Sequence, residues 1–194
     1  MDRRALLLGG LAATLVTIPA LAQTGGSAGS SGMSRTGSPM GQAEMHHMQQ
    51  TMQLGMVALE TSRIALNKAR NEDLKRFANF EVQEQTTLAE VLRSMMDPAA
   101  TAATGSSGAM QGDMQMDASG RDMLQTLQSQ QAGPAFDKAY LDGQMQGHRN
   151  LLQAQEEYLQ SNPQNREHMN VARMARTQIR EHIALLERIQ QTLR

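Results

Sequence analysis

Three side chains of types that bind metals, Glu81, His148 and His182, are predicted to face a shared interior. Each lies at helical spacing from core residues: Leu74, Ala78, Leu88 and Leu92 for Glu81, Leu141 and Leu152 for His148, and Ile179 and Leu186 for His182. Carboxylate and imidazole groups gathered at one depth can bind a transition metal such as iron or copper. The alternative is a hydrogen-bonded polar layer that also includes Gln85, because buried polar groups must be paired.

A second group of thioether and imidazole side chains stands near the start of a predicted helix: Met45, His46, His47 and Met48. Such groups suit soft Cu(I). Successive helical residues point about 100° apart, so the four do not share one face. Met45 and Met48 share a face with Met52, but a core stripe has the same spacing, and methionine is a common core filler. The core interpretation is favoured for these methionines, with a copper trap as the alternative.

Three further methionines lie in a polar segment without neighbouring apolar residues to pack against: Met110, Met114 and Met116. A place in the core therefore explains them less well than it explains the first group. Metal capture or the scavenging of oxidants is the alternative role for thioethers in such a segment.

The first 22 residues have the order of a secretory signal peptide. Arg3 and Arg4 precede an apolar run, and Ala20 and Ala22 form a small-residue cleavage site. We expect cleavage after Ala22 and a periplasmic or secreted protein. The general secretory route is favoured, with the twin-arginine route, suggested by Arg3-Arg4, as the alternative. No later segment approaches the roughly 20 apolar residues of a membrane-spanning helix.

The rest of the chain is predicted to be all-α. A flexible Gly/Ser-rich tether at 23–41 precedes one domain at 42–194. Apolar residues at steps of three and four predict long helices at about 42–69, from Asn71 to Met96, between Pro134 and Ser161, and at about 165–193, with a short helix at 121–130. A long Met/Gly-containing crossover loop at 98–120 would join two helical hairpins. The pattern predicts an up-down four-helix bundle.

Composition excludes several classes of protein. There is no cysteine, so no disulfide can form. A formal net charge of −1 and five aromatic residues give little support for nucleic-acid binding. Glycine-rich phosphate loops and nucleophile motifs are absent from the sequence. A non-enzymatic role is therefore favoured over an enzymatic one, and the sequence does not decide between them.

Two segments carry a resemblance to a known family: "LGMVALETSRIALNKARNEDLKRFANFEV" and "GPAFDKAYLDGQMQGHRNLLQAQEEYL". They resemble the two halves of domain-of-unknown-function family 4142, uncharacterised bacterial proteins often labelled predicted outer membrane protein and placed among ferritin-like bundles. The resemblance covers nearly all of Met45 to Leu193. Its most specific parts are Leu54-Gly55, Leu74 to Ala78, Phe136-Asp137-x-x-Tyr140 and Gly147-His148. It implies export and a ferritin-like fold, but no activity.

A ferritin-like site for two metals needs a Glu from each of two helices and Glu-x-x-His from each of the other two. The one Glu-x-x-His match, Glu44-x-x-His47, lies at the start of a helix rather than at its middle. Gln85 stands where members of the resembled family tend to have histidine. A di-metal oxidase is therefore disfavoured.

The expected function is that of an exported ferritin-like bundle of unknown activity, a non-enzymatic binding protein or one with an envelope or stress role. The alternative is a periplasmic metal-handling protein that binds copper or iron at the Met/His segments or at a degenerate interior site. No cofactor is predicted. The partner would be an unidentified protein or a metal, and an exposed helix face leaves homodimerisation open.

Overall fold

The computed structural model describes residues 40–96 and 116–193. The regular elements within these ranges are all helices: α1 (Gln42–Lys68), α2 (Glu72–Met96), α4 (Ala118–Ser129), α5 (Pro134–Gln160) and α6 (Arg166–Thr192). The prediction of an all-α chain is confirmed. The predicted signal peptide 1–22, most of the tether 23–41, and Met110 and Met114 lie outside the described residues.

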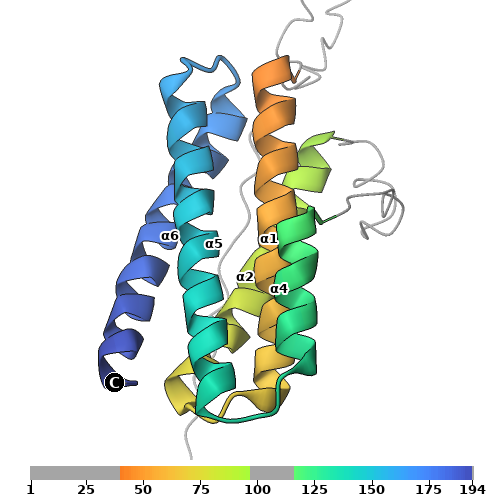
Figure 1. Ribbon diagram of the computed structural model, residues 1–194. Coiled ribbons are helices and arrows are strands. Elements are labelled where there is room, and N and C mark those ends of the chain that lie inside the picture. The colour runs from red at the N-terminus through yellow and green to blue at the C-terminus, as the bar shows by residue number, and fades with distance from the viewer. Residues whose placement is uncertain (1–39, 97–115, 194) are drawn as a thin grey trace, which may run out of the picture. The chain divides into compact units, whose positions relative to one another are not determined.

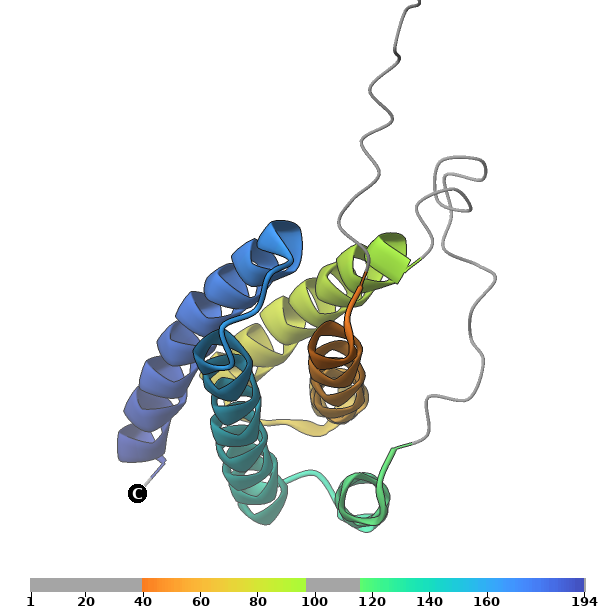
Figure 2. The same cartoon turned by 90° about the horizontal axis from the view of Figure 1, so that it is seen from above.

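The long helices associate through short links. A three-residue connection joins α1 to α2, and a five-residue connection joins α5 to α6, so each pair runs antiparallel (Figure 1). Close backbone contact also joins α1 to α5. The shorter α4 lies along α1 and α5, as the view from above shows (Figure 2). By contrast, α2 and α6 meet mainly through side chains, among them the ion pairs described below.

Side-chain caps decide where three helices begin. Asn71 Oδ1 accepts the backbone N–H groups of Asp73 and Leu74, as its sequence position predicts, and starts α2. Asn165 Oδ1 caps α6 in the same way. Asp117 Oδ1 accepts the N–H of Gly120, at 2.7 Å. Because of this cap, α4 begins at Ala118, and the predicted loop 98–120 ends earlier than expected.

One buried carboxylate fixes the α1–α2 connection onto α5. Asp137 Oδ1 and Oδ2 accept the backbone N–H groups of Arg70 and Asn71, at 3.0 and 2.9 Å. One turn later, the hydroxyls of Tyr140 and Ser62 lie 2.7 Å apart. These contacts fix how far the α1–α2 pair is shifted along its axis relative to α5. That shift decides which interior side chains lie at the same depth.

The apolar interior is divided into separate parts. The largest cluster surrounds Phe77, Phe136 and Tyr140, and a smaller one contains Met48, Met52 and Leu92. The predicted core face of the first helix is wrong at Met45, which is 45% exposed, whereas Met48 and Met52 are buried. Polar residues of α1 take inward positions instead: Glu44, His47, Thr51, Thr61 and Ser62. The interior is therefore unusually polar along α1.

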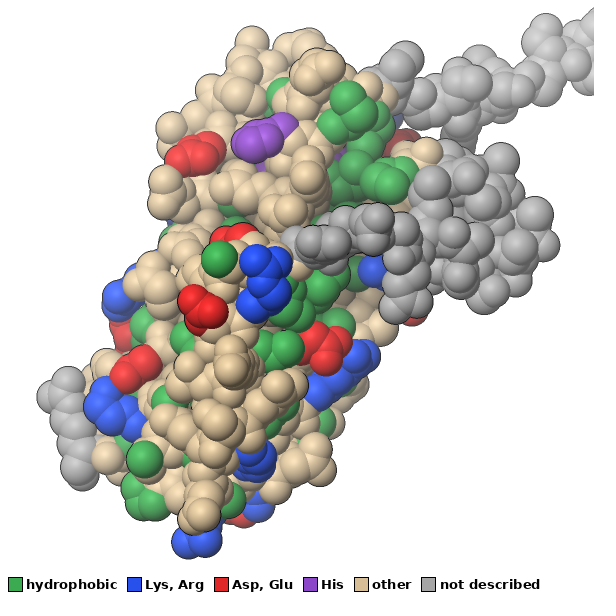
Figure 3. Space-filling view, turned by 45° about the vertical axis from the view of Figure 1, so that its right-hand side comes forward, with side chains coloured by type: hydrophobic (Ala, Val, Ile, Leu, Met, Phe, Trp, Pro, Cys, Tyr) green, Lys and Arg blue, Asp and Glu red, His purple; other side chains and the backbone are tan. Residues whose placement is uncertain are grey.

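None of the helices in the described ranges is long and apolar enough to cross a membrane. On the face drawn in Figure 3, acidic and basic side chains alternate without a large area of one sign.

Candidate metal centre

Glu81 from α2, His148 from α5 and His182 from α6 converge in the interior. Glu81 Oε2 lies 3.2 Å from His148 Nε2 and 3.1 Å from His182 Nδ1. The two imidazole nitrogens are 3.1 Å from each other. The side chains of Glu81 and His148 are fully buried, and that of His182 is 12% exposed. Three potential ligand atoms from three helices therefore form a nearly equilateral triangle.

Gln85 orients the carboxylate of Glu81. Its Nε2 donates a hydrogen bond to Glu81 Oε1 at 2.7 Å, which leaves Oε2 to face the histidines. Gly55 on α1 makes room for this amide, because a Cβ at that position would lie 2.5 Å from Gln85 Oε1. The sequence suggested that Gln85 replaces a lost ligand; in the structure it holds a ligand in place.

Each histidine uses its other ring nitrogen as a donor. His148 Nδ1 lies 2.8 Å from the backbone carbonyl oxygen of Gln144, which can only accept. His182 Nε2 lies 2.9 Å from Glu84 Oε2, a carboxylate oxygen. In the neutral forms of both rings, the remaining nitrogens therefore carry lone pairs directed toward Glu81 Oε2. Glu81 Oε2 makes no well-aligned hydrogen bond.

The charges around His182 alter its titration. Burial by itself would lower the pKa of His182, but the close carboxylates of Glu81 and Glu84, at 3.1 and 2.9 Å, outweigh burial and raise it to about 9. Burial would raise the pKa of Glu81, yet His148 and His182 hold it well below its usual range. Without a metal, protonated His182 forms an ion pair with the carboxylate of Glu81.

The triangle has the dimensions of a metal's ligand set. With metal–ligand distances of about 2.0–2.1 Å, neighbouring ligand atoms are separated by roughly 3.0–3.4 Å. Two histidines and one carboxylate on one side of an ion leave its other positions open, as in non-haem Fe(II) and catalytic zinc sites. The edge of the Phe77 ring packs against both imidazoles, with centroid distances of 5.7 and 5.3 Å. The environment is therefore apolar except for the ligands and their partners.

Residues 30–189 match the family described as Domain of unknown function (DUF4142). The chain belongs to the DUF4142 family. This confirms the resemblance found in the sequence. No curated protein and no solved structure matches the chain.

In this DUF4142 chain, three of the segments that carry the resemblance reach the centre. Phe77, from Leu74 to Ala78, packs against both imidazoles. Gly55, from Leu54-Gly55, accommodates the amide that orients Glu81. His148, from Gly147-His148, is one corner of the triangle. DUF4142 membership supplies no activity, so the chemistry must be argued from this geometry.

A second buried histidine pair lies nearer the start of α1. His47 Nε2 donates to Gln155 Oε1, and His168 Nε2 donates to His47 Nδ1, both at 2.8 Å. Gln155 Nε2 in turn donates to Thr51 Oγ1, which fixes the orientation of its amide. The ring of Tyr158 stacks on His47 at a centroid distance of 4.3 Å. The hydrogen bonds of this network join neutral groups, and His168 Nδ1 is left buried without a hydrogen-bond partner.

The second pair lacks a carboxylate in contact with its rings. Burial and the neighbouring His168 lower the pKa of His47 to about 4. Burial also lowers the pKa of His168. Glu44, the nearest acidic group, accepts the backbone N–H of Gly41 and the hydroxyl of Tyr158 instead. Glu44-x-x-His47 therefore serves the helix start and this network rather than a metal pair.

The structure separates the other predicted ligands. Met45 and His46 are exposed, whereas His47 and Met48 are buried, and Met48 packs against Met52 and Leu92. The four residues do not converge on one point, which agrees with their differing helical faces. Met116 is half-buried just before α4, and the other two loop methionines lie outside the described residues.

Two interacting residues were missed in the sequence. His168 lies one turn before Ala172 on the stripe that continues through Ala175 and Ile179, and that spacing would have identified it as inward-facing. Glu84 was not among the residues predicted to face the interior. Its contact with His182 depends on how α2 and α6 lie against each other.

Proposed function

We propose that this protein is an exported, ferritin-like helical bundle that binds one divalent transition-metal ion between Glu81, His148 and His182. The observation that carries the proposal is the convergence of three ligand atoms at 3.1–3.2 Å while the outer nitrogens of both histidines are committed to other acceptors. Three lone pairs at this spacing repel one another unless a proton or a cation lies among them.

The charge of the site favours a dication over a proton. Glu81 and Glu84 together bring two carboxylates to the two imidazoles. One proton on His182 neutralises only one of them, whereas a dication bound by neutral histidines would balance both. The carbonyl oxygen of Gln144, 2.8 Å from His148 Nδ1, and the carboxylate of Glu84, 2.9 Å from His182 Nε2, are the kinds of partner that typically orient metal-bound histidines.

The ligand chemistry narrows the choice of metal. Two imidazole nitrogens and one carboxylate oxygen suit Fe(II), Zn(II) or Cu(II), whereas Cu(I) prefers the sulfur ligands that this centre lacks. Three protein ligands converge within residues 40–96 and 116–193, so a single ion with open positions is favoured over a pair of ions. The expected function is metal binding or handling outside the cytoplasm. Its location is proposed on the basis of the signal-like residues 1–22.

The ferritin-like arrangement is supported by the two antiparallel pairs, α1 with α2 and α5 with α6, whose side chains meet at mid-depth. Bundles of this class place metal ligands on inward faces of opposing helices. The additional helix α4 lies outside the four long helices and supplies none of the three ligands.

Metal titration of the chelator-stripped full chain tests the proposal. Fe(II) under anaerobic conditions, Zn(II) and Co(II) are each added, and bound metal is measured by elemental analysis after gel filtration. We expect one equivalent for the wild type and loss of binding for Glu81→Gln and for His182→Gln. The matched control is His46→Gln, which changes an exposed histidine and should keep one equivalent.

Circular dichroism must show that each variant remains helical. Absence of bound metal in the wild type at micromolar concentration would refute the proposal, as would unchanged binding by both site variants. The trio would then be an ion-paired polar layer that holds α2, α5 and α6 together.

A further inference from the structure

The proposed metal centre is open to solvent on one side of its three ligands. The side chains of Glu81 and His148 are fully buried, whereas that of His182 is 12% exposed. The ring of Phe77 packs against both imidazoles, and Gln85 bonds to the other carboxylate oxygen of Glu81. An ion that arrives from solvent therefore reaches His182 before it reaches the other two ligands.

Glu84 connects His182 to the surface. Its Oε2 atom is buried and lies 2.9 Å from His182 Nε2, yet the Glu84 side chain as a whole is 33% exposed. One negatively charged side chain thus borders both the centre and the solvent. A carboxylate in this position attracts cations to the opening before they contact a ligand.

A small cavity lies beside this pair, between α2, α5 and α6, and has a volume of about 10 Å³. Glu84, Gln85 and His182 line it together with Gln178 and Ile179 of α6. This volume is close to the least that holds one water molecule. A bare divalent ion is smaller than a water molecule, so the cavity admits the ion without its complete hydration shell. The carboxylate of Glu84 and the amide of Gln178 carry oxygen atoms that can replace the lost water.

The contact between α2 and α6 allows such a passage. These helices meet mainly through side chains, whereas close backbone contact joins α1 to α2, α5 to α6 and α1 to α5. Figure 2 shows α2 and α6 on the side of the bundle away from α4. Rotation of the Glu84 and Gln178 side chains is therefore enough to open the way, without separation of the helix backbones.

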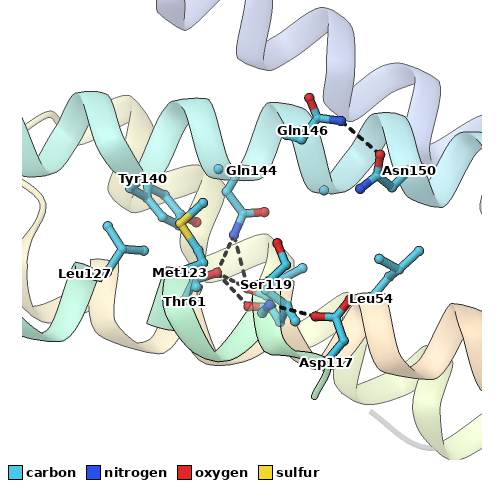
Figure 4. Close-up of a pocket in the computed structure, with 15 residues that line it drawn as sticks. Leu54, Thr61, Asp117, Ser119, Met123, Leu127, Tyr140, Gln144, Gln146 and Asn150 are labelled. Atoms are coloured by element: carbon cyan, nitrogen blue, oxygen red, sulfur yellow. Dashed lines mark hydrogen bonds between the residues drawn. The ribbon is translucent and has the colours of Figure 1, made fainter. Parts of the chain in front are cut away.

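The larger cavity between α1, α4 and α5 gives no second route, because none of the three ligands lines it. Gln144, which does line it, is 3% exposed, and its amide donates to Thr61 Oγ1 and Ser62 Oγ, in a cluster that Figure 4 draws beside Tyr140. Tyr140 packs against Phe77, which in turn packs against the imidazoles. Packed aromatic rings therefore separate this cavity from the centre.

We propose that divalent metal ions enter the centre between α2 and α6, and that Glu84 is the positioning residue that binds the entering ion first. This inference rests on the metal centre proposed above. From Glu84 the ion passes through the small cavity to His182 and Glu81. Once the ion is bound, Glu84 again accepts the outer N–H of His182, the role that its 2.9 Å contact shows.

Stopped-flow mixing of Co(II) with the chelator-stripped full chain tests the role of Glu84, with the visible absorption of bound Co(II) as the signal. Glu84→Gln keeps an acceptor for His182 and removes the charge. We expect its association rate constant to be about tenfold lower at about 0.01 M salt, where the Debye length is about 30 Å. The difference should narrow at about 1 M salt. The matched control is Glu90→Gln, an exposed position on the same helix outside the cavity lining, which should associate as the wild type does.

Gln178→Phe tests the route independently of charge. Gln178 lies one turn before His182 on α6, and the larger ring should obstruct the opening. Association and chelator-driven release should both become slower, by a similar factor, because an ion crosses the same opening in either direction. The control is Thr177→Phe, an exposed neighbour outside the cavity lining, which should change neither rate. Circular dichroism must show that each variant remains helical.

The outcomes separate this inference from the proposed function. If Glu84→Gln accelerated release and left association as in the wild type, Glu84 would only orient His182, and its role in entry would be overturned. Wild-type rates for Gln178→Phe would overturn the route while leaving the metal centre intact. If the wild type took up no Co(II), the metal centre would be refuted and the route with it.

Discussion

The two buried histidine pairs of this protein differ in one respect that changes their chemistry. His148 and His182 share a buried carboxylate, Glu81, whereas His47 and His168 are bonded to each other and to the neutral amide of Gln155. The first pair holds a positive charge, and the pKa of His182 rises to about 9; in the second, the pKa of His47 falls to about 4. Burial by itself lowers the pKa of both histidines, so the carboxylate decides whether the pKa rises or falls.

The largest effect is expected for Glu81→Gln in the metal-free protein. This change leaves the imidazolium of His182 without its buried anion, and it should lower the free energy of unfolding at pH 7 by about 3 kcal/mol. Urea denaturation measures the change. The control is Glu90→Gln, an exposed position on the same helix, which should have little effect. If Glu81→Gln lowered the free energy of unfolding no more than Glu90→Gln does, the buried charge pair of Glu81 and His182 would not stabilise the protein.

A smaller loss, about 2 kcal/mol, is expected for His168→Leu, because it leaves His47 Nδ1 buried without its donor but strands no charge. The same denaturation experiment applies, and metal stoichiometry should not change. If this variant lost as much stability as Glu81→Gln, the neutral pair would be more strongly coupled than its hydrogen bonds imply.

The stability of the metal-free protein should fall in two pH ranges: an alkaline arm that depends on His182 and an acidic arm that depends on His47. Because the folded state binds the proton of His182 more tightly than the unfolded state, its contribution is complete below about pH 6.5 and is lost as pH rises toward 9. His47 acts in the opposite sense: stability falls as pH drops from about 6.5 toward 4, since only the unfolded chain readily accepts the proton.

Melting temperatures measured from pH 4 to 9.5 in the presence of a chelator test both arms. His47→Leu should reduce the acidic arm and leave the alkaline arm as in the wild type. Glu81→Gln should reduce the alkaline arm and also the loss of stability below about pH 4.5, because the folded state lowers the pKa of Glu81 itself. Other groups near the second pair, Glu44, His46 and Tyr158, remain in both variants and serve as a common background. If His47→Leu also flattened the alkaline arm, the two pairs would not be independent.

The smallest effect on stability is expected for Gly55→Ala. The added Cβ displaces Gln85, but alanine favours the helix, so the free energy of unfolding should change by about 1 kcal/mol or less. Metal affinity should fall about tenfold, because Glu81 loses the partner that orients it. The control is Gly147→Ala, whose Cβ meets nothing, and it should leave metal affinity unchanged. Equal metal affinities for the two variants would show that Gln85 does not support the centre.

Sequence patterns predicted the long helices well because each depends on local signals. Asn71 and Asn165 cap their helices, and Pro134 begins α5 as a residue without a backbone N–H should. The prediction was poorer at the start of α1, where Met45 points outward although it fits an apolar stripe. Polar residues of that helix found partners on α5 and α6, and their pairing set the rotation of the helix.

The helical period of the sequence by itself determined that Glu81, His148 and His182 face inward, and the family resemblance and all-α class were equally readable from it. Only the tertiary structure decided which inward-facing groups meet. Whether Glu81 contacts His182, or His47 contacts His168, depends on the stagger and rotation of helices far apart in the chain. Those quantities are set by contacts such as Asp137 with the α1–α2 connection and Gly55 with Gln85, which no periodicity along one helix encodes.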